Sequence, residues 1–301
     1  MKDTDRGGAR RTAGVRIGLP KGHMQAGVLE LLGDAGVDVR LGGRNYRPLV
    51  SWPGFKAKLL KPQNVVEMLH AGSRDVGFAG ADWVAELDAD VVELLDTGLD
   101  PVRVVAAAPV ALLTDGALPA AHPAGRPFVV ASEYVRTARR WIAGQPFDAV
   151  LVRSYGATEV FPPEDADLIV DNTASGSTLR ANGLRIVDTL MRSSTRLYAG
   201  RAALDDPVRR GAIEDLVLLL SSVLEARNRV MLELNVAEAD FDRVVSVLPC
   251  MREPTVSRLH GERAYAVRAA VPRRGLPELI LDVRSRGGTD LVVSAPQQIV
   301  P

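Results

Sequence analysis

Residues 15–36 read VRIGLPKGHMQAGVLELLGDAG, and this stretch decides the fold class. It begins with the apolar run Val15 to Leu19, breaks at Pro20-Lys21-Gly22, and continues with apolar residues at helical spacing. A buried strand that leads into an amphipathic helix is the repeating unit of α/β proteins. The same alternation recurs as far as a strand expected at Asp167 to Val170. A chain of such units predicts a mostly parallel sheet that helices cover on both faces.

The repeated units fall into two groups, which predict two α/β lobes around a cleft, the architecture of periplasmic binding proteins. We expect the first lobe to comprise residues 15–95 and 185–228, and the second lobe residues 96–184. The turn-rich segments Asp96 to Asp100 and Arg180 to Arg185 are the expected crossings, because each separates two apolar strands. A cleft between two lobes is a natural ligand site.

The C-terminal part of the sequence has a different order of elements. A long helix is expected from about Asp206 to Asn228, and residues 229–301 then read as strand, helix, strand, strand, helix, strand. The order βαββαβ is that of ferredoxin-like domains, so we predict an ACT-like domain of this class. At the other end, residues 1–14 are polar and rich in Gly and Arg, and we expect them to form a disordered tail.

The composition excludes several classes of protein. The 301 residues include 37 Lys and Arg against 37 Asp and Glu, which leaves no excess of cations for a nucleic acid or an anionic membrane surface. The single cysteine, Cys250, cannot form an internal disulfide, and the N-terminus lacks the apolar core of a signal peptide. The most apolar run, residues 216–223, is far shorter than the roughly 18 residues of a membrane span. We therefore expect a cytoplasmic protein, and any nucleotide that it binds should be small.

A loop of small hydroxylated residues follows an apolar strand in LIVDNTASGSTL, residues 168–179. Backbone N–H groups of such a loop converge at a helix N-terminus, where the partial positive charge favours an anion. The hydroxyls of Thr173, Ser175, Ser177 and Thr178 add donors, and Asp171 is placed to hold a sugar hydroxyl. The pattern indicates a phosphate site, with plain helix capping as the alternative.

The same segment resembles the phosphoribosyl-diphosphate loop of the ATP phosphoribosyltransferase family, which catalyses the first step of histidine biosynthesis. The shared pattern is D-x-x-x-x-G-x-T-L, here Asp171 to Leu179, followed by Ala181-Asn182-Gly183-Leu184. Further segments resemble the family in the same order: Ile17 to Gly22, Lys61-Pro62-Gln63, Asp75 to Gly80, Arg103, Ala131 to Tyr134, Gly156 to Val160, Glu253-Pro254-Thr255 and Ala270 to Arg274. The segments follow the family order over about residues 15 to 295, so the chain resembles the long form of the family, which carries a C-terminal regulatory domain.

The resemblance implies a reaction, a cofactor and partners. Such an enzyme joins N1 of the adenine of ATP to C1 of phosphoribosyl diphosphate and releases pyrophosphate. Mg²⁺ would sit mainly on phosphate oxygens and waters. The spacing of the four histidines gives no sign of a zinc site. The family further implies a homo-oligomer, with dimers that assemble into hexamers, and histidine as an allosteric inhibitor.

The resemblance also assigns site residues. Phosphoribosyl diphosphate would be bound by Asp171, Thr173, Ala174, Ser175, Gly176, Ser177 and Thr178. ATP or pyrophosphate would be bound by Lys21, Lys61, Arg103, Tyr134 and Glu159, with Tyr134 stacked on adenine. No residue is assigned as a general acid or base, because the reaction needs neutralised pyrophosphate and correct placement more than a strong base. The alternatives are a solvated loop cation for Lys21, packing for Tyr134 and a helix-dipole partner for Glu159.

Several positions depart from the family pattern. His23 stands in place of an arginine, Ala81 in place of a basic residue and Asn64 in place of an acidic one, which bears on nucleotide affinity and the choice of purine. In the C-terminal domain a histidine-type regulatory site is expected at Asn235, Met251, Thr255 and Ser294. Because Asn235 stands where an acidic residue can occur and Glu253 where the family has serine, we expect weakened or absent histidine feedback.

Two other functions are compatible with the sequence. Solute-binding proteins share a two-lobe fold, although they usually carry an export signal. A catalytically weak regulatory homologue would account for the missing basic residues. Turnover of ATP and phosphoribosyl diphosphate in the presence of magnesium distinguishes these functions from the enzyme.

Overall fold

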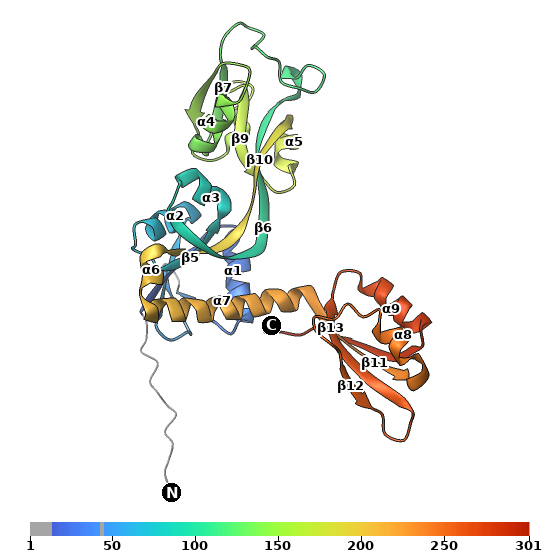
Figure 1. Ribbon diagram of the computed structural model, residues 1–301. Coiled ribbons are helices and arrows are strands. Elements are labelled where there is room, and N and C mark those ends of the chain that lie inside the picture. The colour runs from blue at the N-terminus through green and yellow to red at the C-terminus, as the bar shows by residue number, and fades with distance from the viewer. Residues whose placement is uncertain (1–13, 43–44, 301) are drawn as a thin grey trace. The chain divides into compact units, whose positions relative to one another are not determined.

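The computed structural model describes residues 14–42 and 45–300 (Figure 1). The tail expected over residues 1–14 therefore lies outside the described residues, except for Gly14. The chain divides into two compact units, the first made of residues up to 30 together with 37–214, and the second of residues 31–36 and 215 onward.

An eight-stranded sheet forms the centre of the first unit. Its strands are β1 (Val15–Pro20), β4 (Phe55–Leu60), β5 (Val76–Gly80), β6 (Val91–Pro109), β7 (Phe128–Ser132), β8 (Ala149–Arg153), β9 (Leu168–Thr173) and β10 (Leu184–Gly200). Their order is β4-β1-β5-β10-β6-β9-β7-β8. The pairs among β4, β1 and β5 and those among β9, β7 and β8 are parallel, whereas every pair that involves β6 or β10 is antiparallel. The expected parallel sheet is thus two parallel halves joined by an antiparallel pair.

The two halves of the sheet are the centres of two α/β lobes, as expected. Lobe I contains β1, β4 and β5 with α2 (Pro62–His70) and α3 (Ala81–Leu87), and lobe II contains β7, β8 and β9 with α4 (Val135–Ala143) and α5 (Ser177–Ala181). Strand β1 is followed by α1 (Met24–Asp34), and a separate hairpin is formed by β2 (Val39–Gly42) and β3 (Asn45–Val50). After β10 the chain forms α6 (Arg201–Asp205) and α7 (Pro207–Asn228).

The crossings between the lobes are the long strands β6 and β10, which run side by side from lobe I into lobe II (Figure 1). The expected crossing at Arg180 to Arg185 is wrong, because Arg185 pairs with Ala108 at the lobe II end of β10. The expected crossing at Asp96 to Asp100 is a strand segment with register shifts rather than a turn. Paired strands satisfy most backbone N–H and C=O groups of a chain that passes between lobes, which favours a strand pair at the crossing.

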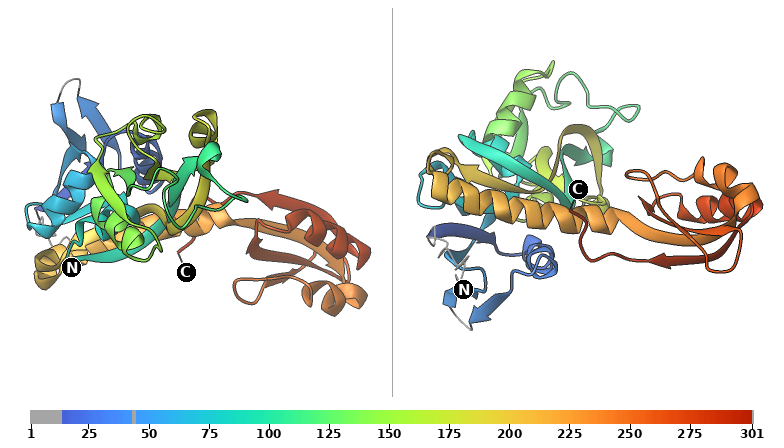
Figure 2. Two further views of the ribbon diagram at one scale, coloured as in Figure 1. Left: turned by 90° about the horizontal axis from the view of Figure 1, so that it is seen from above. Right: turned by 60° about the horizontal axis from the view of Figure 1, so that its bottom comes forward.

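The second unit contains a ferredoxin-like domain, which confirms the expected βαββαβ order. Its elements are β11 (Arg229–Ala237), α8 (Phe241–Val245), β12 (Thr255–Arg258), β13 (Ala264–Pro272), α9 (Leu276–Ser285) and β14 (Gly288–Ser294). The strands form one antiparallel sheet in the order β12-β13-β11-β14. Alternate residues of β11, from Val230 to Val236, pack with Val244 and Val283 of the two helices, which cover one face of the sheet (Figures 1 and 2). None of the helices in the described parts of the chain is long and apolar enough to cross a membrane.

Candidate active site

The predicted phosphate loop lies between β9 and α5 in lobe II. Gly176 adopts a φ of 74°, a left-handed conformation that favours glycine. The Gly176 N–H donates a hydrogen bond of 3.0 Å to Thr173 Oγ1, and Arg180 Nη1 donates one of 3.0 Å to the carbonyl of Ser175. These bonds brace the loop into a compact turn.

The loop presents small exposed side chains. Ala174, Ser175, Ser177 and Thr178 are exposed, and the hydroxyls of Ser175 and Ser177 lie 3.0 Å apart. The buried hydroxyl of Thr173 is used inside the turn. The arrangement therefore offers hydroxyl donors at 175, 177 and 178 to a ligand, with Thr173 as a bracing residue.

Asp171, at the end of β9, has a raised pKa. Burial and the negative charges of Glu159 and Glu133 raise the pKa of Asp171 from 3.8 to about 6, although the N–H of Asn172 donates to its carboxylate at 2.7 Å. A carboxylate with this pKa titrates close to neutral pH, and such groups gather at functional sites.

Two arginines lie beside the loop on the crossing strands. The sheet register places Arg103 of β6 directly opposite Thr173 on one side and opposite Arg192 of β10 on the other. Residues directly opposite one another project to the same face of a sheet. Arg192 is thus a candidate anion-binding residue that the sequence analysis missed, because only the pairing of β6 with β10 puts it next to Arg103.

The two predicted lysines occupy element ends in lobe I. Lys21 follows β1, and its Nζ lies 3.7 Å from the centre of the Tyr46 ring in the hairpin. This cation–π contact limits the positions open to the ammonium group. Lys61 is exposed at the N-cap of α2, where Pro62 begins the helix.

A small cavity between the lobes brings several of these positions together. Its volume is about 40 Å³, and its lining includes His23, Pro62, Val102 and Asn172. Each of these four is one or two residues from a predicted site residue: Lys21, Lys61, Arg103 and Asp171 respectively. Both lobes therefore contribute chain neighbours of predicted residues to one cavity, whereas Lys21, Lys61, Arg103 and Asp171 do not line it themselves.

Tyr134 sits in this cleft region as a fully buried side chain (0% exposed). Its ring stacks on Trp83 with centroids 4.7 Å apart, and its hydroxyl donates to Asp82 Oδ2 at 2.6 Å. Burial and the charge of Asp82 raise the pKa of the Tyr134 hydroxyl above its ordinary value, so the hydroxyl keeps its proton. In this conformation the ring that was expected to stack on adenine stacks on Trp83 instead. Glu159 is half-buried in a short 3-10 helix, Thr158–Val160, near Asp171.

Asp75, the first residue of a family-like segment, has a structural role. It is buried (1% exposed), and Arg16 donates to its carboxylate from Nε at 2.9 Å and from Nη2 at 2.7 Å. Burial alone would raise the pKa of Asp75, but the hydrogen bonds and charge of Arg16, with the charge of Arg209, hold it below its ordinary value. The segment thus ties β5 to β1 and to the start of α7.

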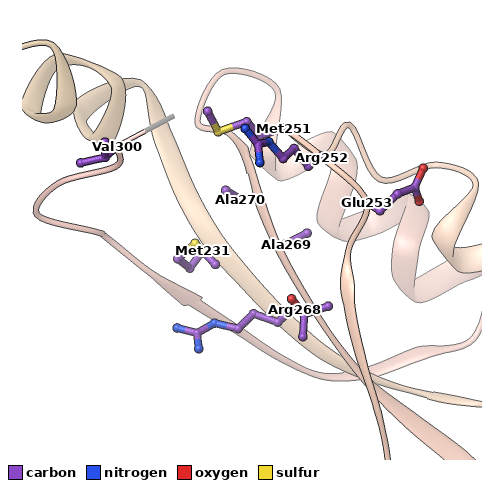
Figure 3. A pocket seen from close by; sticks show the side chains of 9 residues that line it. Met231, Met251, Arg252, Glu253, Arg268, Ala269, Ala270 and Val300 are labelled. Atoms are coloured by element: carbon purple, nitrogen blue, oxygen red, sulfur yellow. The ribbon is translucent and has the colours of Figure 1, made fainter. Parts of the chain in front are cut away.

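The predicted regulatory residues are distributed over two hollows of the ferredoxin-like domain. Met251 and Thr255 line a hollow of about 540 Å³ together with Met231 and Arg268 (Figure 3). Ser294 pairs with Met231 across β14 and β11, so it belongs to the same end of the sheet.

Asn235 lines a different hollow, of about 450 Å³, with His260 and Asp290. Its amide donates to Asp290 Oδ2 at 3.0 Å, so a carboxylate that the sequence analysis missed lies beside it. Figure 3 shows the carboxylate of Glu253 pointing away from Met231 and Arg268. Within one chain, the structure gathers three of the four predicted residues and leaves Asn235 apart.

The described residues contain no group of three or more His, Cys, Asp or Glu side chains that could hold a metal ion. A divalent cation would have to arrive with a ligand that supplies most of its oxygens.

Comparisons with known proteins identify the family of the chain. The family model "ATP phosphoribosyltransferase" (HisG) matches residues 61–222, and the model "HisG, C-terminal domain" matches residues 226–296. The ATP phosphoribosyltransferase of Desulforudis audaxviator is 36% identical over 293 residues, which cover 95% of this chain and 99% of that protein. The ATP phosphoribosyltransferase of Pelodictyon phaeoclathratiforme is 35% identical over 280 residues, which cover 91% of this chain and 93% of that protein.

A solved structure shares the fold. The ATP phosphoribosyl transferase (HisG:HisZ) complex from Thermotoga maritima contains a chain that matches with a TM-score of 0.61 at 21% identity, over 70% of this chain and 98% of that chain. Together with the phosphate loop at the end of β9 and the ferredoxin-like domain, these matches show that the chain belongs to the ATP phosphoribosyltransferase family.

Proposed function

We propose that the protein joins N1 of the adenine of ATP to C1 of phosphoribosyl diphosphate, with release of pyrophosphate, as the first step of histidine biosynthesis. The observation that carries the proposal is the braced loop Thr173 to Thr178, set beside two arginines in a chain of this family. The N1–C1 bond forms as the bond from C1 to the pyrophosphate oxygen breaks. Positive charge develops on the ribose ring, so the site has to hold both phosphate groups and the adenine in place.

The phosphate loop would bind the 5′-phosphate of phosphoribosyl diphosphate. Ser175, Ser177 and Thr178 supply exposed hydroxyls, Ala174 leaves its part of the backbone exposed, Gly176 allows the left-handed turn, and Thr173 braces it. Asp171 would accept hydrogen bonds from the ribose hydroxyls in its ionised form. Its pKa of about 6 leaves most of the carboxylate ionised at pH 7 and above.

The cations of the cleft would neutralise the triphosphate and the departing pyrophosphate. Arg103, with Arg192 beside it, flanks the loop, and Lys21 and Lys61 project from lobe I. Guanidinium groups suit bidentate phosphate contacts and ammonium groups act as point charges. Glu159 and the ring of Tyr134 are assigned to ATP, the ring once it leaves its stack on Trp83.

Magnesium is assigned to the substrate rather than to the protein. Pyrophosphate oxygens and waters give the octahedral oxygen ligands that Mg²⁺ prefers, and residues 14–42 and 45–300 hold no group of three or more His, Cys, Asp or Glu side chains that could bind a metal ion. When bound with phosphoribosyl diphosphate, the ion would offset charge on the leaving group.

Regulation, assembly and location belong to the same proposal. We assign a histidine-type site to Met251, Thr255 and Ser294, with Asn235 at the other end of the sheet, and expect weak feedback. A homo-oligomer, from dimer to hexamer, and a cytoplasmic location are proposed from the family resemblance. Light scattering of the purified chain, with and without histidine, tests the assembly.

A steady-state assay of pyrophosphate release tests the reaction. Release should require ATP, phosphoribosyl diphosphate and magnesium together. Release from phosphoribosyl diphosphate without ATP, or none with the full mixture, would contradict the proposal. A binding protein or an inactive homologue would give the second result.

A further inference from the structure

Besides the crossing strands, the lobes are joined by contacts between α3 of lobe I and the start of α4 of lobe II. We call this set the lobe clasp. Its members are Asp82, Trp83 and Glu86 on α3, Tyr134 and Thr137 at α4, and Asn172 on β9.

The first part of the clasp is a buried hydrogen-bonded chain through the Tyr134 hydroxyl. The hydroxyl donates to Asp82 Oδ2 at 2.6 Å and accepts from Asn172 Nδ2 at 2.9 Å. The other oxygen of Asp82 accepts from the hydroxyl of Ser193, on the crossing strand β10, at 2.6 Å. One hydroxyl thus joins α3, α4 and the residue that follows Asp171 in the phosphate segment.

The second part is a helix cap supplied from the opposite lobe. Glu86, buried at 8% exposure, accepts the N–H groups of Arg136 at 2.8 Å and Thr137 at 2.9 Å, together with the Thr137 hydroxyl at 2.9 Å. A carboxylate at a helix N-terminus satisfies unpaired N–H groups and interacts favourably with the helix dipole. Trp83, on the same helix as Asp82 and Glu86, stacks on Tyr134 with 24° between the ring planes.

The clasp lines a cavity between the lobes that is smaller than usual ligand pockets. The space lined by Asp82, Trp83 and Asn172 measures about 40 Å³, whereas ligand pockets usually measure about 300–1,000 Å³. The crossing strands that would act as hinge carry register shifts between Ser193 and Thr195 and at neighbouring positions, where a strand pair bends most easily.

We propose that the lobe clasp holds the cleft closed in the free protein, and that Tyr134 is a positioning residue whose hydroxyl must release Asp82 before phosphoribosyl diphosphate and ATP enter. The proposal rests on the proposed function, because it takes those two substrates as the ligands of the cleft. Through Asn172, release of the clasp also frees the segment that carries Asp171. The measured association constant then equals the association constant of the open form multiplied by the fraction of protein that is open.

Tyr134→Phe tests the clasp because it removes the hydroxyl and keeps the ring for stacking. It leaves Asp82 Oδ2 without its donor in the closed form, where water is excluded, and so favours opening. Loss of one such hydrogen bond shifts the opening equilibrium roughly fivefold. Glu86→Gln should act in the same direction, since its amide nitrogen cannot accept an N–H.

The experiment is calorimetric titration of the full chain with magnesium phosphoribosyl diphosphate, and separately with ATP, alongside the thermal midpoint. The clasp predicts that Tyr134→Phe and Glu86→Gln bind phosphoribosyl diphosphate severalfold more tightly while their thermal midpoints fall. Asp88→Asn is the matched control, because it breaks an exposed ion pair between the same helices, Asp88 to Arg136 at 2.7 Å, and should change affinity less than twofold.

The outcomes distinguish failure of the proposed function from failure of the lobe clasp. Wild-type protein that binds neither substrate overturns the proposed function, and the clasp with it. Wild-type binding with unchanged or weaker binding by both variants overturns the clasp alone, because a merely structural pair would lower stability without raising affinity. Equal gains in Asp88→Asn would also overturn it, since they would trace the effect to charge rather than to the buried contacts.

Discussion

Gly176→Ala is the most informative change in the phosphate loop. At a φ of 74° an L-residue costs about 1–2 kcal/mol relative to glycine. The added Cβ would also lie 3.2 Å from Arg180 Nη1, the atom that holds the Ser175 carbonyl. The substitution therefore strains the backbone and displaces the brace of the loop.

Gly183→Ala is the matched control for this change. Gly183 has a φ of 69°, close to that of Gly176, and a Cβ there would meet no described atom within 4 Å. The two variants should lose similar stability, and 1–2 kcal/mol corresponds to a fall of about 2–8 °C in Tm for a unit of this size. Only Gly176→Ala should raise KM for phosphoribosyl diphosphate, by about tenfold if 1.4 kcal/mol of phosphate binding is lost, with KM for ATP nearly unchanged.

Thermal melts and steady-state kinetics with each substrate varied in turn measure these effects. Equal KM values for phosphoribosyl diphosphate in the two variants would show that the loop does not bind the 5′-phosphate. A larger effect on KM for ATP than on KM for phosphoribosyl diphosphate would also refute the reasoning, because it would exchange the two sites.

Three further predictions follow from single side chains. The pKa of Asp171 is about 6 in the folded protein, against an ordinary value of 3.8. Between about pH 4 and 6 the folded state therefore keeps a proton that the unfolded state has released. The free energy of unfolding falls as pH rises through this window. Asp171→Asn should remove that loss and raise Tm at pH 7 while weakening phosphoribosyl diphosphate binding; melts at pH 5 and 7 that match those of the wild type would contradict it. Lys21→Gln should lower kcat/KM for one substrate with a change in Tm of no more than about 1 °C, because a half-buried loop cation contributes little to stability. Equal losses of stability and activity would indicate a structural role. Histidine should inhibit weakly, and inhibition at micromolar histidine in a kinetic titration would show that the Asn235–Asp290 pair replaces a lost carboxylate.

The strand and helix pattern was predictable where a face of each element is buried within its own lobe. The bounds of helix α4, Val135–Ala143, can be predicted from the sequence, since its apolar spacing is regular and Gly144 follows it. The ferredoxin-like order was predictable for the same reason. Helix α3 was missed because Asp82 and Glu86, two of its buried residues, are polar and are satisfied by partners about 50 or more positions away in the sequence.

The sequence predicts which motifs belong to the candidate site, but it predicts only part of how their residues are placed in space. The phosphate loop has its local signals in one segment, so its bracing by Thr173 agrees with the expected strand, loop and helix. The neighbour Arg192 and the enclosure of Tyr134 depend on the pairing of β6 with β10 and on contacts between lobes. A local pattern carries no information on either.

Identification of the product is the most direct test of phosphoribosyl transfer to N1 of ATP. The protein, ATP, phosphoribosyl diphosphate and magnesium are incubated, and the nucleotide product is analysed by mass spectrometry and NMR. We expect ATP bearing one phosphoribosyl group on N1 and one pyrophosphate released per product molecule, with both greatly reduced in Gly176→Val. Unmodified ATP after prolonged incubation with folded protein, or a phosphoribosyl group on another atom, would contradict it.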